Sequence, residues 1–157
     1  MILLVVLPLY YILSLYFLDK YYFLCPVEYE RQIIIRNDQW GEGHFGARRS
    51  GGRKHNGIDL YAEIGAPVFA CRSGRVLLAE ERPGIGKFVL LEHPYNLRTL
   101  YGHLSEISVA SNHLVRQGQL IGGVGKTGNA DIRAILPHLH LEVRKGGIAQ
   151  DPMEYLD

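Results

Sequence analysis

Apolar and polar residues alternate with a period of two along residues 137–143, and this alternation predicts a β-strand. One face of that strand carries aliphatic side chains that suit a hydrophobic core: Leu139, Leu141 and Val143. The other face carries His138, His140 and Glu142, and its two imidazoles are about 6.5–7 Å apart at the backbone. They are close enough to share one small site. Taken alone, the pair is more typical of a half-exposed strand with two surface histidines.

Short apolar runs recur at close intervals through the later two-thirds of the chain. They cover residues 58–61, 68–71, 75–79, 87–92, 99–104 and 138–144, and clusters of turn residues separate them. This pattern predicts an antiparallel all-β domain, a sheet or sandwich, over residues 41–157. Roughly 115 residues can bury about two-thirds of their surface and fold alone. Residues 32–36 are a further candidate strand, Trp40 marks a candidate entry to the domain, and residues 41–57 form a glycine-rich loop.

The amino terminus has no polar face. Residues 1–18 contain no charged side chain and approach the ~20 residues that a membrane-spanning helix needs. The sequence therefore predicts a transmembrane helix as an anchor over residues 1–24, followed by a linker over residues 25–40. A cleaved signal peptide is the alternative, but its usual basic start and small cleavage-site residues are missing. Lys20 and Arg31 follow the apolar run, and by the positive-inside rule they weakly favour a cytoplasmic location for the domain.

Charge and cysteine content narrow the possible functions only slightly. The formal net charge is +1 and no basic stripe stands out, so the sequence gives no support for nucleic-acid binding. The two cysteines, Cys25 and Cys71, lack the spacing of a metal site. We favour two free thiols, while a disulfide outside the cytoplasm stays open.

A second motif can bring a carboxylate to the histidine strand. His55 and Asp59 are four residues apart with Gly57 between them, and the glycine-rich setting favours a turn that leads into a strand. An imidazole and a carboxylate can then converge, and His140 would add a second nitrogen. Two histidines and one carboxylate, with a fourth position left to water, are typical of catalytic zinc.

A third motif ends the apolar run at residues 99–104. Thr99, Tyr101 and His103 are expected to share one face of this strand. Gly102 leaves room for the close approach of something bulky, such as a neighbouring strand. His103 alone would be interpreted as a surface histidine.

The order H-x-x-x-D, Y-G-H-L and H-L-H resembles the lysostaphin-type (LytM-like) zinc metallopeptidases, which cut peptidoglycan cross-links. The resemblance extends over about residues 41–156 and includes F-G-A-R at 45–48, G-A-P-V-F-A at 65–70 and V-R-Q-G-Q-L-I-G at 115–122. It implies a LytM-like domain that binds one Zn²⁺ through His55, Asp59 and His140. It also implies that His138 and His103 are catalytic histidines beside the metal.

The resemblance further implies a substrate and a location. The substrate would be a peptidoglycan stem peptide or cross-bridge, cut by a zinc metalloendopeptidase that is anchored in the membrane with its catalytic domain outside the cytoplasm. Two other functions stay open: a non-catalytic LytM-like regulator that activates a separate cell-wall hydrolase, and a binding module for wall glycans. The complete set of three ligands and two histidines favours the enzyme.

One segment departs from the family pattern. The family usually joins the glycine turn to P-H-L-H through a short Ser/Thr-Gly segment, whereas residues 129–136 are longer and lack that glycine. This loop should lie beside the catalytic pair, where Asp131 and Arg133 either contact substrate charges or are simply solvated. The shape of the substrate groove is therefore left open by the sequence.

Overall fold

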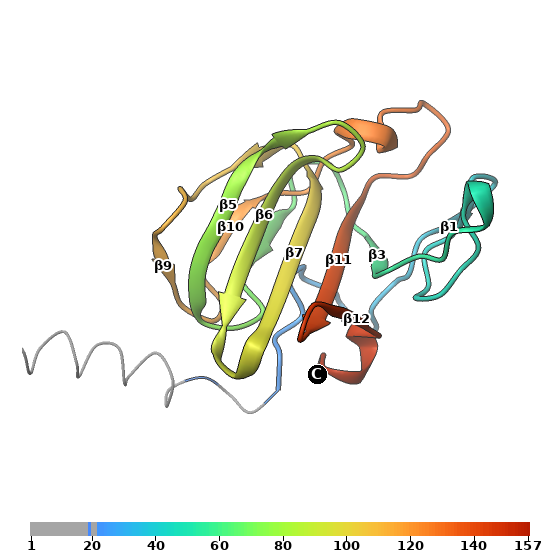
Figure 1. The fold of residues 1–157 in the computed structure, drawn as a ribbon. Helices are drawn as coiled ribbons and strands as arrows, with labels where there is room; N and C mark the ends of the chain where they lie inside the picture. Colours follow the sequence, from blue (N-terminus) through green and yellow to red (C-terminus); the bar gives the residue numbers. More distant parts are fainter. Residues whose placement is uncertain (1–18, 20–21) are drawn as a thin grey trace, which may run out of the picture.

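The computed structural model describes residue 19 and residues 22–157, and this part of the chain is built from strands and short 3-10 turns (Figure 1). The strands are β1 Asn37–Asp38, β2 Gly41–Glu42, β3 Ile58–Tyr61, β4 Pro67–Phe69, β5 Gly74–Arg82, β6 Gly86–His93, β7 Leu97–Leu104, β8 Glu106–Ile107, β9 Leu114–Val115, β10 Leu120–Gly123, β11 His138–Lys145 and β12 Ile148–Gln150. The 3-10 turns are η1 Ser50–Gly52, η2 Pro94–Asn96, η3 Gly128–Ala130 and η4 Pro152–Glu154. The six predicted apolar runs correspond to β3, β4, β5, β6, β7 and β11.

The strands form one large sheet and two small ones. The large sheet has the order β12-β11-β7-β6-β5-β9, and β3 pairs with β11 next to β12. A three-stranded sheet has the order β4-β10-β8, and β1 and β2 form a short hairpin. Within the described residues, all these named strands pair antiparallel. The predicted antiparallel all-β class is therefore confirmed.

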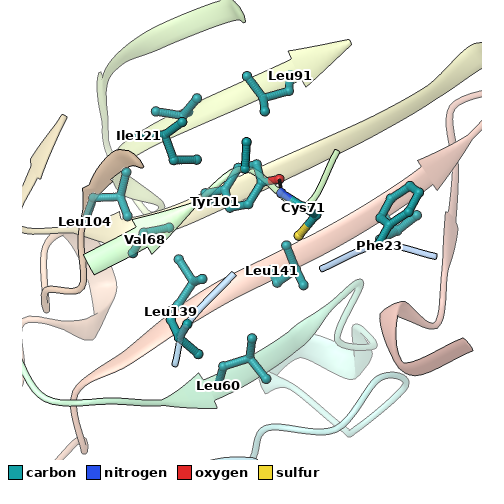
Figure 2. Close-up of a cluster of buried hydrophobic side chains, with 14 of the residues drawn as sticks. Phe23, Leu60, Val68, Cys71, Leu91, Tyr101, Leu104, Ile121, Leu139 and Leu141 are labelled. Atoms are coloured by element: carbon teal, nitrogen blue, oxygen red, sulfur yellow. Dashed lines mark hydrogen bonds between the residues drawn. The ribbon is translucent and has the colours of Figure 1, made fainter. Parts of the chain in front are cut away.

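The hydrophobic core joins the large sheet to the three-stranded sheet. Tyr101 of β7 and Leu141 of β11 share one buried cluster with Val68 of β4 and Ile121 of β10 (Figure 2). The aliphatic face predicted for residues 137–143 is fully buried: Leu139, Leu141 and Val143 are each 0% exposed. Burial of one such side chain stabilises a fold by about 1.5–3 kcal/mol. The Tyr101 hydroxyl accepts a hydrogen bond from Cys71 N at 2.9 Å, so its polar end is also satisfied.

The chain before residue 41 packs onto the domain at several points. Phe23 is 2% exposed, and its N–H donates to Tyr155 O at 3.0 Å while its carbonyl oxygen accepts from Asp157 N at 3.2 Å. The Asp19 carboxylate accepts from Ser73 N at 2.8 Å and from Ser73 Oγ at 2.5 Å. Cys25 and Cys71 are both free thiols, as the sequence favours.

The candidate strand over residues 32–36 is wrong. Within it, Ile35 forms only an isolated bridge with Leu60, and paired strand structure begins at β1. The chain turns there into the β1–β2 hairpin, so its pairing with β3 is too short for a ladder. Trp40 lies in that hairpin turn and is 54% exposed, and its role as a mark of the domain entry stays a prediction.

The predicted transmembrane anchor falls almost wholly on residues 1–18, 20 and 21, which lie outside the described residues. In the part of the chain that the structure describes, no helix combines the length and the apolar character needed to cross a bilayer. The division into an anchor over 1–24, a linker over 25–40 and a domain over 41–157 stays a prediction.

Candidate metal centre

Asp59 and His140 face each other across the pairing of β3 with β11. The register places His140 opposite Asp59 and Leu141 opposite Ile58. Directly opposed residues of an antiparallel pair point to the same face, with Cβ atoms about 4.5–5.5 Å apart. Because Leu141 and Ile58 point into the core, His140 and Asp59 point together to the opposite face.

Gly57 lets the loop before β3 approach β11 closely. A Cβ at this position would lie 2.2 Å from the carbonyl oxygen of Leu141, nearer than any side chain can come. The loop brings His55 to the site, where its Nε2 lies 3.1 Å from Asp59 Oδ1. The predicted turn into a strand does bring His55 and Asp59 together, and a backbone contact is what requires the glycine.

The candidate ligand atoms of His55, Asp59 and His140 form a nearly equilateral triangle. His55 Nε2 lies 3.0 Å from His140 Nδ1, and Asp59 Oδ1 lies 2.9 Å from His140 Nδ1 and 3.1 Å from His55 Nε2. Donor atoms at 2.0–2.1 Å from a tetrahedral zinc ion are spaced about 3.3 Å apart. All three residues are buried. The triangle therefore fits one face of a zinc coordination tetrahedron in size and in chemistry.

The ring nitrogens that face away from this triangle have their own acceptors. His55 Nδ1 lies 2.9 Å from the His44 carbonyl oxygen, and His140 Nε2 lies 3.2 Å from Glu142 Oε1. Carbonyl and carboxylate oxygens only accept, so these two outer nitrogens carry a proton. Arg144 Nε in turn donates to Glu142 Oε2 at 2.7 Å. His55 Nε2 and His140 Nδ1 are thereby left as the nitrogens that can bind a cation.

His140 lies between the carboxylates of Asp59 and Glu142. Burial lowers the pKa of His140, but its contacts with both carboxylates outweigh burial and raise the pKa to about 9. A cation in the triangle would compete with the proton on Nδ1. Metal binding at this site is therefore expected to release a proton.

His138 lies beside the triangle on the same face of β11. Its Nε2 is 3.9 Å from Asp59 Oδ1, and its Nδ1 is 2.7 Å from the carbonyl oxygen of Leu136. Nδ1 thus donates to Leu136, and Nε2 presents a lone pair toward the site. Burial lowers the pKa of His138, so the ring is neutral at pH 7.

His103 reaches the same site through an exception to strand geometry. Tyr101 lies in the core, so regular alternation would send His103 into the core as well. The φ of His103 is instead 61°, in the left-handed region, and this re-aims the side chain. Its ring centre lies 5.1 Å from that of His138 and 5.8 Å from that of His140. The prediction that His103 shares a face with Tyr101 is therefore wrong, because one left-handed residue breaks the alternation.

Two backbone carbonyls hold His103 in this position. Its N–H donates to Ile85 O at 3.0 Å, and its Nδ1 lies 2.9 Å from Thr127 O. The Ile85 side chain also covers Gly102, where a Cβ would lie 2.4 Å from Ile85 Cδ1. Gly102 does leave room for a bulky neighbour, and that neighbour is the β5–β6 turn. Burial, followed by the two nearby imidazoles, lowers the pKa of His103 to about 3.

Two arginines hold the second carboxylate oxygen of Asp59. Arg36 Nη2 donates to Asp59 Oδ2 at 2.9 Å, and Arg49 Nη2 donates to it at 3.2 Å. Arg36 is only 5% exposed, and its Nη1 lies 2.7 Å from Asp38 Oδ2. Burial alone would raise the pKa of Asp59, but its interactions with the neighbouring His140 and His55 keep this pKa well below its usual range. The carboxylate is therefore ionised, with Oδ1 directed to the triangle and Oδ2 to the arginines.

Sequence reasoning missed most of these outer contacts. Arg36 and Asp38 fall in the predicted linker and Arg49 in the glycine-rich loop, where an isolated charge gives no signal. The one available hint is that Arg36 ends an isoleucine run, which is typical of a partly buried segment. Glu142 could have been found, because it shares an alternating face with His138 and His140.

The antiparallel sheets and the buried His-Asp-His triangle together define a LytM-like domain. Residues 53–152 match Peptidase family M23, and the chain belongs to this family. The resemblance to lysostaphin-type peptidases is thereby confirmed.

Three known proteins illustrate the relationship. Peptidoglycan DD-endopeptidase ShyB of Vibrio cholerae is 40% identical over 89 residues, which are 57% of this chain and 20% of ShyB. A zinc-containing peptidase from Vibrio cholerae has a TM-score of 0.68 and 33% identity, over 84% of this chain and 39% of that one. A chain of the solved SpoIIQ–SpoIIIAH pore-forming complex matches with a TM-score of 0.61 and 34% identity, over 70% of this chain and 70% of that one. The chain thus spans only a fifth of the length of ShyB, at 20%.

Proposed function

We propose that this chain is a zinc-dependent endopeptidase that hydrolyses peptide bonds of peptidoglycan stem peptides or cross-bridges. The observation that carries the proposal is the buried triangle of His55, Asp59 and His140 with two further imidazoles beside it. Peptidases of family M23 are zinc-dependent, and the relatives of this chain include a peptidoglycan DD-endopeptidase. Both facts support the same chemistry at this site.

The three residues of the triangle would hold the ion. His55 and His140 would contribute neutral nitrogens and Asp59 a single negative charge. A zinc ion bound there would act as a Lewis acid that polarises the scissile carbonyl and lowers the pKa of water toward about 7. Because the triangle supplies only one negative charge, the loaded site keeps a net positive charge that favours the developing oxyanion.

His138 is the proposed general base. Its hydrogen bond to Leu136 O directs the Nε2 lone pair into the site, and its lowered pKa keeps the ring neutral at pH 7. A neutral imidazole can take a proton from a water molecule and pass it on to the leaving amine. Positioned bases of this kind contribute about 10²–10⁴-fold to a rate.

His103 is proposed to accept a hydrogen bond from the leaving amine. Its Nδ1 donates to Thr127 O, so in the neutral ring Nε2 can only accept a hydrogen bond. An accepting nitrogen suits an amine N–H better than it suits an oxyanion. His103 could assist the oxyanion only after taking up a proton, which its low pKa opposes.

The location follows from the substrate. Peptidoglycan lies outside the cytoplasm, so we propose an extracytoplasmic catalytic domain that is tethered to the membrane through residues 1–18, the part of the predicted anchor that precedes the contacts of Asp19 and Phe23 with the domain. The apolar, uncharged sequence of residues 1–18 supports the tether.

A second candidate function is a non-catalytic partner-binding module. It is supported by the similarity to stage II sporulation protein Q and to a chain of the solved SpoIIQ–SpoIIIAH pore-forming complex. Such a module has no need for an intact triangle or for two neutral imidazoles beside it. We therefore favour the enzyme.

The test is digestion of purified peptidoglycan by the full zinc-loaded chain, with the new chain ends identified by mass spectrometry. The full chain is used because a fragment that starts at residue 41 would lack Phe23, which is part of the core. We expect new amino and carboxyl ends, none after chelation, and far slower release of these ends by His138→Ala. A folded, zinc-loaded protein that releases no new ends would contradict the enzymatic function and favour the partner-binding one.

A further inference from the structure

Leu136 contacts the site through both of its backbone polar groups. Its carbonyl oxygen accepts from His138 Nδ1 at 2.7 Å, and its N–H donates to Asp38 Oδ2 at 3.1 Å. Leu136 ends the segment 129–136, which is longer than its counterpart in lysostaphin-type peptidases. The segment that departs from the family pattern is therefore the one that holds the proposed base.

Asp38 connects Leu136 to the candidate ligand Asp59. Asp38 Oδ2 lies 2.7 Å from Arg36 Nη1, and Arg36 Nη2 donates to Asp59 Oδ2 at 2.9 Å. Asp38 Oδ1 accepts from Trp40 N at 2.8 Å, which fixes the rotation of the carboxylate. Contacts thus run without a break from the carboxylate of the triangle, through the β1–β2 hairpin, to the imidazole that would act as base.

The side chains of this series are shielded from water. Their exposed fractions are 4% for Asp59, 6% for Arg36, 8% for Asp38 and 4% for His138. Solvent screens charges weakly at such depth, and a charge that loses its partner there is strongly destabilised. The ion pairs of Arg36 with Asp38 and Asp59 therefore restrain their members more tightly than ion pairs at the surface would. The hydrogen bond from Leu136 N to Asp38 is exposed and is the weaker link of the series.

We propose that Arg36 and Asp38 are positioning residues that hold the ligand Asp59 and the base His138 in a fixed mutual arrangement. Arg36 draws Oδ2 of Asp59 outward, which leaves Oδ1 for the metal. Asp38 orients the Leu136 peptide, whose carbonyl oxygen sets the ring of His138. This inference rests on the proposed function in requiring that zinc binds at Asp59.

Arg49 provides a matched control. It donates to the same Asp59 oxygen as Arg36, at 3.2 Å, yet its other hydrogen bonds go to the carbonyl oxygens of Glu42 and Arg48 and not to Asp38. Its loss should weaken the hold on Asp59 without loosening Leu136. An effect transmitted along the series can thus be separated from a general loss of positive charge near the metal.

The first measurement is zinc affinity, obtained by chelator competition on the purified full chain. Changes to residues that orient a ligand typically cost 10–100-fold in metal affinity. We expect the Kd for zinc to rise about 10–100-fold in Arg36→Met and, by a similar factor, in Arg49→Met.

The second measurement is the ¹⁵N NMR signal of the protonated His138 Nδ1 in the zinc-loaded chain. We expect this signal to shift or broaden in Asp38→Ala and Arg36→Met and to stay in place in Arg49→Met. Asp38→Asn keeps an oxygen that can accept from Leu136 N, so it should restore the signal that Asp38→Ala loses.

Kinetics on peptidoglycan fragments supply the third reading. At saturating zinc, Asp38→Ala should lower kcat about tenfold with little change in KM, because the base is misplaced while substrate binding is not. Circular dichroism confirms the fold of each variant, and Asp38→Asn serves as the second variant where Asp38→Ala fails to fold.

Distinct results would overturn the inference. It is wrong if folded Asp38→Ala and Arg36→Met retain the zinc affinity and the His138 signal of the parent chain, or if Arg49→Met loses that signal equally. It is also wrong if the parent chain binds no zinc. If zinc affinity and the NMR signal respond as expected while no variant or parent chain cleaves peptidoglycan, the proposed function fails and the positioning role stands.

Discussion

The two faces of β11 are almost equally buried, yet different interactions hold them. On one face Leu139, Leu141 and Val143 are 0% exposed, and on the other His138 is 3% exposed and His140 and Glu142 are 8% exposed. The aliphatic side chains need only apolar neighbours at packing distance. Each imidazole, in contrast, has a specific hydrogen-bond acceptor: the carbonyl oxygen of Leu136 for His138 Nδ1, and Glu142 Oε1 for His140 Nε2.

This difference shows how one strand serves both the fold and the site. Because side chains alternate exactly along a strand, burying Leu141 in the core fixes the direction of His140. The apolar face therefore sets the register, and the polar face uses it. A substitution on the apolar face should therefore lower the free energy of unfolding. A substitution on the polar face should change metal binding and the rate of hydrolysis.

The largest effect is expected from His140→Ala. This change removes one corner of the triangle and leaves Asp59 and Glu142 facing each other without the imidazole between them. We expect loss of stoichiometric zinc and a fall in peptidoglycan hydrolysis of about 10⁴-fold or more. Metal analysis of the purified variant and a hydrolysis assay check this, and full activity would refute the assignment of His140 as a ligand.

His138→Ala should separate metal binding from rate. His138 is not a corner of the triangle, so zinc should stay bound while hydrolysis slows by about 10²–10⁴-fold. Zinc content and kcat/KM are measured on the same preparation. Unchanged rates would move the role of the base to another group, with His103 the first candidate.

Leu141→Ala should act on stability instead. Truncation of a fully buried leucine leaves a cavity, and we expect a loss of about 2–5 kcal/mol in the free energy of unfolding. Leu141→Met, which conserves volume, should cost less than about 1.5 kcal/mol. Urea unfolding measures both. A loss of zinc affinity in still-folded Leu141→Ala that exceeds the loss in His138→Ala would break the division between the two faces.

The smallest effect concerns His93, a buried imidazole outside both faces of β11. Burial lowers its pKa from 6.5 to about 4, and its nitrogens contact Ser73 O and Thr99 Oγ1. The unfolded chain therefore takes up a proton below pH 6.5 that the folded chain refuses until about pH 4. The contribution of His93 to the free energy of unfolding is fully present above pH 6.5 and is lost as the pH falls. This loss amounts to about 2 kcal/mol between pH 7 and pH 5.

His93→Gln provides the comparison for this pH dependence, since glutamine does not titrate. Urea unfolding at pH 7 and pH 5 should show a smaller loss of stability in this variant than in the parent chain. Equal losses in the two proteins would mean that His93 is not the group responsible.

Much of the sheet could be predicted from the sequence, because most strands of four or more residues show an alternation or an apolar run. This holds for β3, β6, β7 and β11. β10, with two glycines in four residues, shows neither. The two-residue strands β1, β2, β8 and β9 are too short to have a period. They are defined by hydrogen bonds to a neighbouring strand, and that neighbour is set by the tertiary fold and not by the local sequence.

The candidate site divides in the same way. The residues of the triangle could be proposed because His55, Asp59 and His140 belong to short motifs with restricted geometry. The direction of His103 could not, since it depends on a single left-handed φ. The contact between Asp38 and Leu136 joins residues 98 positions apart, and no local pattern announces it.

The attachment of Phe23 beside the other end of the described chain has a mechanical consequence. Phe23 forms a parallel bridge with Leu156, and hydrogen bonds join it to Tyr155 and Asp157. A force that pulls Phe23 away from residues 155–157 would act first on these hydrogen bonds. It would reach β11 only after they break. Forces transmitted through flanking sequence should therefore be absorbed there, and the coordination geometry around Asp59 should be mechanically insulated from them.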